Sequence, residues 1–148
     1  GRLILSDALV YAKRYNPEFV IDLATLTGAA ARAIGHYAIV GMGNAGAEAM
    51  STLQASGLAT HERVVEFPFW DEYKELLKSP IADMKNIGGA EAGAITAGKF
   101  LEHFTDYPYI HLDIAGPAFL KKRMGYRVEG GTGVGVRLLF DFLSKKSA

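Results

Sequence analysis

Three glycines in the order Gly41-x-Gly43-x-x-Gly46 match the spacing of a dinucleotide-binding turn. Glu66 stands about 20 residues further on, where such sites place the acidic residue that binds the ribose. An aromatic-proline-aromatic run follows Glu66, however, and it does not suit a central parallel strand. The alternative is that the glycines only form a tight turn between a strand and a helix, and the sequence favours that interpretation.

A second glycine pattern, from Gly93 to Lys99, has the spacing of a phosphate-binding loop. Phe100 stands where such a loop needs a Ser or Thr to bind magnesium. Alanines and an isoleucine also fall at helical spacing here, so the glycines belong inside a helix. The sequence therefore does not predict a phosphate-binding loop.

The spacing of the His, Asp and Ser side chains does not predict a metal site or a catalytic nucleophile. Only His111 and Asp113 share a face, as i and i+2 of a strand. Two groups make an incomplete zinc site, which generally takes three or four protein ligands, so structural hydrogen bonds are the better interpretation. No Gly-x-Ser-x-Gly elbow is present. The histidines show no ligand spacing; they are His36, His61, His103 and His111.

Composition limits the class of protein. The chain has 148 residues, 49% hydrophobic and 22% charged, which predicts one globular domain over residues 1–148. Sixteen basic residues balance sixteen acidic ones, so charge gives no argument for a nucleic-acid or membrane partner. With no cysteine, disulfides and thiolate metal sites are excluded. No apolar run approaches the ~20 residues of a membrane span, and Asp7 interrupts the only signal-like stretch.

The stretch from Phe19 to Gly35 organises the predicted fold. Phe19–Asp22 reads as a buried strand, and an alanine-rich helix follows with Thr27 as its capping residue. Between them, small polar residues and a glycine expose backbone N–H groups at the carboxyl end of the strand, where open α/β sheets bind ligands. On this stretch alone, an ordinary strand-to-helix connection is the simpler interpretation.

The remaining chain alternates between helical and strand patterns. Such alternation predicts a parallel sheet covered on both faces. The helix expected over Arg2–Tyr15 should pack with Leu5, Ala8, Leu9 and Ala12 on its buried face. It begins without a preceding strand or an initiator Met, as expected for a chain cut from something longer. The expected helices are Arg2–Tyr15, Thr27–Ile34, Glu48–Ala55 ending at Gly57, Trp70–Leu77, Ala94–Phe104 and Val134–Leu143; the expected strands are Tyr37–Val40, Val64–Phe69 and Tyr109–Ile114; Ile81–Gly93 and Gly116–Gly133 are expected to be irregular.

Six colinear blocks together resemble the leucyl (cytosol) aminopeptidase family. The resemblance covers essentially the whole chain and is far more specific than any single motif above. It implies the carboxyl-terminal part of a catalytic domain, a three-layer α/β/α sandwich with a mostly parallel sheet in which Phe19, Tyr37 and Tyr109 each open or lie in a parallel strand. The blocks are Gly1–Leu9, Asp22–Ala29, Ala82–Gly89, Ala92–Ala97, His111–Gly116 and Gly131–Arg137.

The family is a two-metal exopeptidase that removes amino-terminal residues from peptides. Its signature reads Asn-Thr-Asp-Ala-Glu-Gly-Arg, and this chain begins at the last two letters. The resemblance therefore implies that the ligands of two divalent ions, zinc or manganese, precede Gly1, together with a catalytic lysine. It further implies a cytoplasmic hexamer, a glycine-rich turn that binds no nucleotide, and no metal ligand at His111 or Asp113.

The resemblance assigns six site residues in this chain. Arg2 corresponds to the signature arginine, which lies beside the metals and holds a bicarbonate ion thought to act as general base. Its forked guanidinium suits a planar oxyanion. Small side chains in the pocket for the first substrate residue leave room for a leucine-like group, whereas a charged specificity would require a counter-charge there. The residues that line the substrate cleft by this resemblance are Thr25, Leu26, Gly28, Ala115 and Ala118.

Three functional classes follow from the sequence. The first is the aminopeptidase part, which is expected to be inactive as an isolated chain. The second is a dinucleotide-binding module that uses the glycine turn and Glu66. The third is a non-catalytic interaction subunit, which would need a larger exposed apolar surface than a sequence can reveal.

Overall fold

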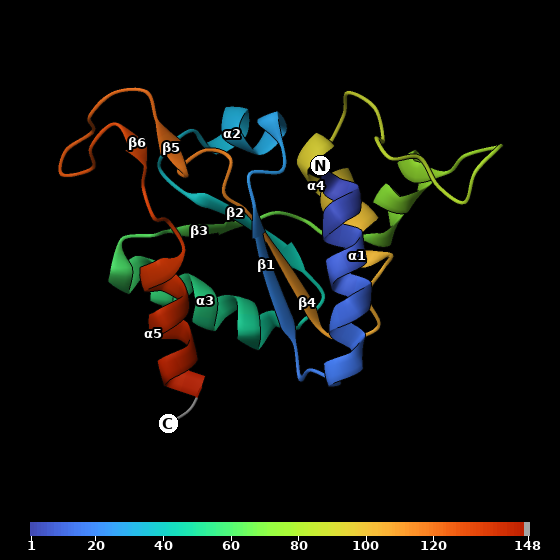
Figure 1. Cartoon of the computed structure of the whole chain (residues 1–148), viewed down its shortest axis with the longest axis horizontal. Helices are drawn as coiled ribbons and strands as arrows, with labels where there is room; N and C mark the ends of the chain where they lie inside the picture. Colours follow the sequence, from blue (N-terminus) through green and yellow to red (C-terminus); the bar gives the residue numbers. More distant parts are fainter. Residues whose placement is uncertain (147–148) are drawn as a thin grey trace.

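A computed structural model describes residues 1–146 and contains a four-stranded sheet (Figure 1). The strand order is β1-β4-β2-β3, so β1 and β4 are neighbours although about 90 residues separate them. A separate two-stranded ribbon, β5 and β6, lies in the connection before the last helix. The strands are β1 (Val20–Ala24), β2 (Ile39–Gly43), β3 (Val64–Glu66), β4 (Tyr109–Asp113), β5 (Phe119–Leu120) and β6 (Gly130–Gly131).

The sheet is mostly parallel, as the sequence predicted. β1 pairs parallel with β4, and β2 pairs parallel with β3. The central pairing of β2 with β4 is antiparallel. Tyr109 lies in β4, whereas Phe19 and Tyr37 precede β1 and β2. The strand that follows Tyr37 thus has one parallel and one antiparallel neighbour.

Helices cover both faces of the sheet, so the predicted α/β/α sandwich is confirmed. On one face α3 packs against α5 (Figure 1). On the other face α4 contacts α1 and α2, and a 3-10 helix packs against α4. The helices are α1 (Arg2–Ala12), α2 (Gly28–Ile34), α3 (Ala47–Thr60), α4 (Gly93–Glu102) and α5 (Val136–Lys146); the 3-10 helices are Lys13–Tyr15 and Asp71–Leu77.

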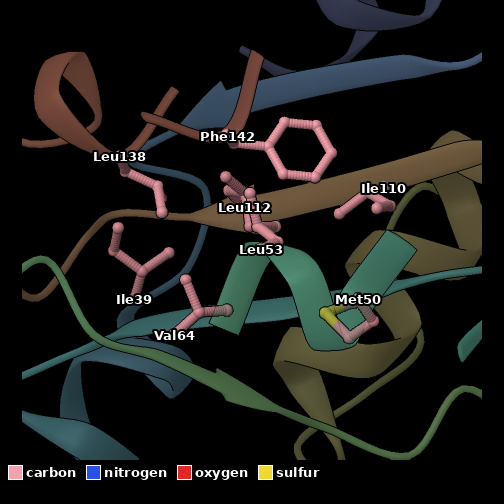
Figure 2. Packing of buried hydrophobic residues seen from close by; sticks show 8 residues of the cluster. All are labelled: Ile39, Met50, Leu53, Val64, Ile110, Leu112, Leu138 and Phe142. Atoms are coloured by element: carbon pink, nitrogen blue, oxygen red, sulfur yellow. The ribbon is translucent and has the colours of Figure 1, made fainter. Parts of the chain in front are cut away.

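A cluster of buried apolar side chains fills the core between the sheet and α3 and α5 (Figure 2). Alternate residues of β4, Ile110 and Leu112, point to this face, as the two-residue period of a strand requires. Burial of such side chains stabilises by roughly 1.5–3 kcal/mol each. The buried members are Ile39, Met50, Leu53, Val64, Ile110, Leu112, Leu138 and Phe142.

The opposite face of β4 carries Tyr109, His111 and Asp113, all of them buried. Apolar clusters from α1, α2 and α4 enclose them. The Tyr107 hydroxyl donates to the Leu9 carbonyl at 2.7 Å and so fastens α1 to this layer. All of the polar side chains that β4 buries therefore face the α1, α2 and α4 layer.

Several predicted boundaries change in the structure. α3 continues through the buried Gly57 to Thr60. A Cβ at residue 57 would lie 2.8 Å from the Glu62 carbonyl oxygen, so the glycine allows the chain that follows α3 to pass close to the helix. Ala8 was expected on the packed face of α1 but is exposed; Leu9 is buried and Leu5 and Ala12 are half-buried. The irregular 116–133 connection includes the β5–β6 ribbon.

The glycine turn is the main correction to the sequence interpretation. Gly41 and Gly43 lie inside β2, and only Gly46 precedes α3. A Cβ at Gly43 would overlap the Tyr109 carbonyl and lie 2.8 Å from the Ile110 Cα. Gly43 therefore serves the close approach of β2 to β4, whereas Gly46, with a φ of +92°, serves the turn that leads into α3.

No helix within residues 1–146 is both long and apolar enough to cross a bilayer.

Substitution of Gly43 tests the close contact between β2 and β4. We expect Gly43→Ala to lower the free energy of unfolding by about 3 kcal/mol, because the new methyl group meets backbone atoms that cannot rotate away. The matched control is Gly131→Ala, which meets nothing within 4 Å and should change stability by less than about 0.5 kcal/mol. Urea unfolding followed by circular dichroism gives both values; equal effects would contradict the packing argument.

Candidate functional site

The Asp113 carboxylate joins two loops at the carboxyl end of β1 and β4. It is 1% exposed. Its Oδ1 accepts hydrogen bonds from the Leu26 amide at 3.2 Å and the Ala115 amide at 3.1 Å. Its Oδ2 accepts the Thr27 hydroxyl at 2.7 Å. One buried carboxylate thereby fixes the loop after β1 relative to the loop after β4.

Thr27 connects this carboxylate to α2. Its hydroxyl donates to Asp113 and accepts the Ala30 amide at 3.0 Å, so it caps α2 as the sequence predicted. Around it, Thr25 and Gly28 are exposed and Leu26 is half-buried. The turn thus exposes Thr25 and Gly28, while hydrogen bonds from Asp113 and Thr27 hold its backbone in place.

Ala115 and Ala118 lie on the loop that follows β4. Both are half-buried. The Ala118 amide donates to the Ile114 carbonyl at 3.0 Å, and the Ala118 carbonyl accepts the Thr132 amide at 3.0 Å. Ala115 is held by Asp113 and lines a surface hollow beside α2. These two alanines therefore belong to an ordered loop.

Arg2 lies at the start of α1, on the same side of the sheet. Its Nη1 donates to the Asn86 carbonyl at 2.7 Å, and its guanidinium lies 5.7 Å from the centre of the Phe100 ring. Partial burial lowers the pKa of Arg2, and the negative charge of Asp113 opposes that shift. Arg2 is thus within electrostatic reach of the carboxylate that organises the two loops.

A second buried polar cluster lies further along the same face. The Asp22 carboxylate accepts the Tyr109 hydroxyl at 2.5 Å and contacts His111 Nδ1 at 2.9 Å. Burial, aided by the charge of Asp22, raises the pKa of Tyr109. His111 and Asp113 therefore make structural hydrogen bonds, as the sequence predicted. Within residues 1–146, no three His, Asp or Glu side chains gather as metal ligands.

The structure thus brings Leu26, Thr27 and Ala115 together through one carboxylate, and Thr25 and Gly28 lie in the same turn as Leu26 and Thr27. The sequence had left Asp113 without this role, because the bond between residues 26 and 113 spans 87 positions. Its local signal was a charged residue at the end of a mostly apolar strand pattern. Thr27, which the sequence treated only as a cap, is the other residue that holds the site.

Comparison with known proteins identifies the family. Residues 1–140 match the sequence profile of the Cytosol aminopeptidase family, catalytic domain. A probable cytosol aminopeptidase of Chlorobium phaeobacteroides is 53% identical over 148 residues, and one of Geobacter sulfurreducens is 52% identical over 144 residues. These matches cover 98% and 97% of this chain, and each covers 29% of the relative.

A solved structure agrees with the sequence relatives. A mutant of tomato leucine aminopeptidase superimposes with a TM-score of 0.89 at 35% identity. The match covers 97% of this chain and 28% of that protein. The chain therefore spans a little over a quarter of the length of the relatives it matches. Fold and sequence agree, and this chain belongs to the cytosol aminopeptidase family, whose catalytic domain it matches over residues 1–140.

Proposed function

We propose that this chain forms the substrate-binding side of an aminopeptidase that hydrolyses the amino-terminal residue from peptides. The observation that carries the proposal is the Asp113 carboxylate, which fixes the 25–28 turn and Ala115 in one arrangement. Exopeptidase chemistry requires the peptide backbone to be held in a constant position relative to the reacting groups. A turn braced by a buried carboxylate supplies such a fixed wall.

The residues of the turn divide the work of binding. The Leu26 amide donates to Asp113. The Leu26 carbonyl is the group proposed to accept a hydrogen bond from the substrate backbone. Gly28 is the first residue of α2, where helical geometry gives its amide no intrahelical partner. Thr25, Ala115 and Ala118 then border the side chain of the first substrate residue. Each of these roles follows the family resemblance, and the exposure of Thr25 and Gly28 supports it.

Arg2 is proposed to hold a planar oxyanion, bicarbonate by family resemblance, beside the reacting bond. Only its Nη1 is used in a hydrogen bond within the described chain, so donors remain for a bound anion. Two divalent ions, zinc or manganese by family resemblance, would supply Lewis-acid activation of the scissile carbonyl and of a water when bound. The described residues offer no ligand cluster for these ions, so no step through them is assigned to this chain.

The geometry gives the dinucleotide-binding alternative no support. A fingerprint turn needs its first two glycines between strand and helix, where backbone amides approach the pyrophosphate. Gly41 and Gly43 instead lie within β2, and Glu66 lies in β3, parallel to it. We therefore retain the aminopeptidase as the proposed function.

Assembly and location follow the same proposal. The family resemblance indicates a hexamer in the cytoplasm, and the relatives are named cytosol aminopeptidases. An exposed apolar face on α1 supports packing against further protein. Its members are Leu3, Ile4, Val10 and Tyr11, with Tyr15 just beyond the helix.

Hydrolysis of a leucine chromogenic amide tests the function. The complete protein that carries this chain should turn the amide over in the presence of zinc or manganese. The purified 148-residue chain should give only background, because the family's metal ligands and catalytic lysine are expected to precede Gly1. Turnover by the chain alone would contradict this assignment, and no turnover by the complete protein with either metal would refute the function.

Thr27 tests whether the braced turn matters to the reaction. In the complete protein, Thr27→Val should lower kcat/KM for the leucine amide by about tenfold, since it removes a charge-assisted hydrogen bond and the cap of α2. Thr27→Ser keeps both bonds and should recover most of the activity. Equal losses in the two variants would show that the hydroxyl is not the positioning group.

Self-association of the isolated chain tests the apolar face. The exposed side chains of α1 favour association, as does the outer edge of β1, which pairs with no strand within residues 1–146; a net charge of zero offers little repulsion. Light scattering after size exclusion should report oligomers or aggregates. Ile4 is 74% exposed, and Ile4→Lys should shift the chain toward the monomer. A monodisperse wild-type monomer at micromolar concentration would contradict the expectation.

A further inference from the structure

The Arg2 guanidinium lies over the ring of Phe100, a buried residue of α4. Arg2 is the first residue of α1, and α1 packs beside α4 (Figure 1). The guanidinium carbon lies 5.7 Å from the centre of the Phe100 ring. At such a distance a cation is attracted by the electron-rich face of the ring. Phe100 therefore gives Arg2 a fixed surface on one side.

The irregular segment 78–92 holds Arg2 from a second side. Its Asn86 carbonyl accepts a hydrogen bond from Arg2 Nη1 at 2.7 Å. Two residues later, a Cβ on Gly88 would lie 2.9 Å from both the Cβ and the Cγ2 of Thr96. Only a residue without a side chain lets the segment pass so close to α4. The Asn86 carbonyl is thereby held beside α4.

One face of α4 supports both contacts. Thr96 and Phe100 are four residues apart in α4, so their side chains lie one above the other on the same side of the helix. Both are buried. A phosphate-binding loop would need a hydroxyl at position 100, and the phenylalanine found there contacts a cation instead. α4 thus sets the position of the ring and of the Asn86 carbonyl relative to each other.

The charge of Arg2 has no carboxylate in contact with it. Within residues 1–146, Arg2 forms no ion pair with an Asp or Glu. A guanidinium has five N–H donors, and the Asn86 carbonyl uses only one nitrogen. A fork that is held at two points presents its remaining donors in one direction, which favours a planar oxyanion in one orientation.

We propose that Phe100 is a positioning residue for the reaction, because with the Asn86 carbonyl it holds the Arg2 guanidinium in the orientation that binds the oxyanion. This inference rests on the proposed aminopeptidase function and on the role of Arg2 in it. A long side chain that is already held in place loses less conformational freedom when the anion binds. Loss of the ring should therefore weaken anion binding and leave the contacts of the substrate turn unchanged.

Phe100→Leu in the complete, metal-loaded protein tests this role, because it removes the ring and keeps an apolar side chain. We measure kcat and KM for the leucine chromogenic amide, and the bicarbonate concentration that gives half the maximal rate in degassed buffer. That concentration should rise about fivefold, as expected for the loss of one cation–ring contact. The KM for the amide should not change, and saturating bicarbonate should restore most of kcat.

Phe104→Leu is the matched control. The rings of Phe100 and Phe104 pack together with 5.2 Å between their centres, so either substitution removes the same aromatic pair. Only Phe100 lies under Arg2. The control should therefore keep the wild-type dependence on bicarbonate.

Chemical modification of Arg2 provides a readout that does not use turnover. Phenylglyoxal reacts with accessible guanidinium groups, and mass spectrometry of the peptide that contains Arg2 gives the rate. This rate should rise about fivefold in Phe100→Leu, since the guanidinium is less firmly held, and should stay at the wild-type value in Phe104→Leu. Bicarbonate should protect Arg2 in the wild type and do so only at higher concentration in Phe100→Leu.

Gly88→Ala tests the second contact without a change in the core. The added methyl group meets Thr96, so the segment must move and carry the Asn86 carbonyl with it. The half-saturating bicarbonate concentration should rise in this variant as well.

Equal bicarbonate dependence and equal Arg2 modification in Phe100→Leu and Phe104→Leu would overturn this inference, and their turnover of the leucine amide would leave the proposed function standing. If Phe100→Leu does not fold, a Gly88→Ala variant with wild-type bicarbonate dependence would overturn it instead. A wild-type rate that does not depend on bicarbonate would also overturn it. Absence of turnover by the complete wild-type protein would overturn both.

Discussion

A buried carboxylate has to be hydrogen-bonded, and in this protein that requirement determines the geometry of the site. Burying an unpaired charge costs far more than a folded domain can spare. Asp113 meets the requirement with two backbone amides and one hydroxyl, drawn from the loop after β1 and the loop after β4. Moving either loop would leave the carboxylate unsatisfied. These three hydrogen bonds therefore hold Ala115 in a defined position relative to the 25–28 turn.

Local chemistry was readable from the sequence, and contacts between distant segments were not. Thr27 could be recognised as a cap because its partner, Ala30, is three residues away. Gly43 was misread because its reason for being glycine is the backbone of Tyr109 on another strand. The predicted end of the helix at Gly57 was wrong for the same reason, because the sequence alone does not distinguish a glycine that ends a helix from one that lets another segment pack closely against it. The antiparallel join between β2 and β4 likewise leaves no local pattern.

The residues of the candidate site also differ in how far the sequence alone could identify them. Arg2, Thr25, Leu26, Gly28, Ala115 and Ala118 came from family resemblance, not from periodicity or spacing. Asp113 carried little signal, because its partners Leu26 and Thr27 lie on a loop 87 and 86 positions away.

The pairing of β1 with β4 also sets an order of events during synthesis. Val20 pairs with Tyr109, 89 positions later, so β1 leaves the ribosome long before its neighbour exists. At about 5–20 residues per second, translation of the intervening chain takes roughly 4–18 s. During that interval Asp22 and the 25–28 turn lack the tyrosine, histidine and aspartate that later enclose them. The hydrogen bonds of Asp22 and of the 25–28 turn to β4 therefore form only after residues 109–113 have been synthesised, so the site takes its geometry late in translation.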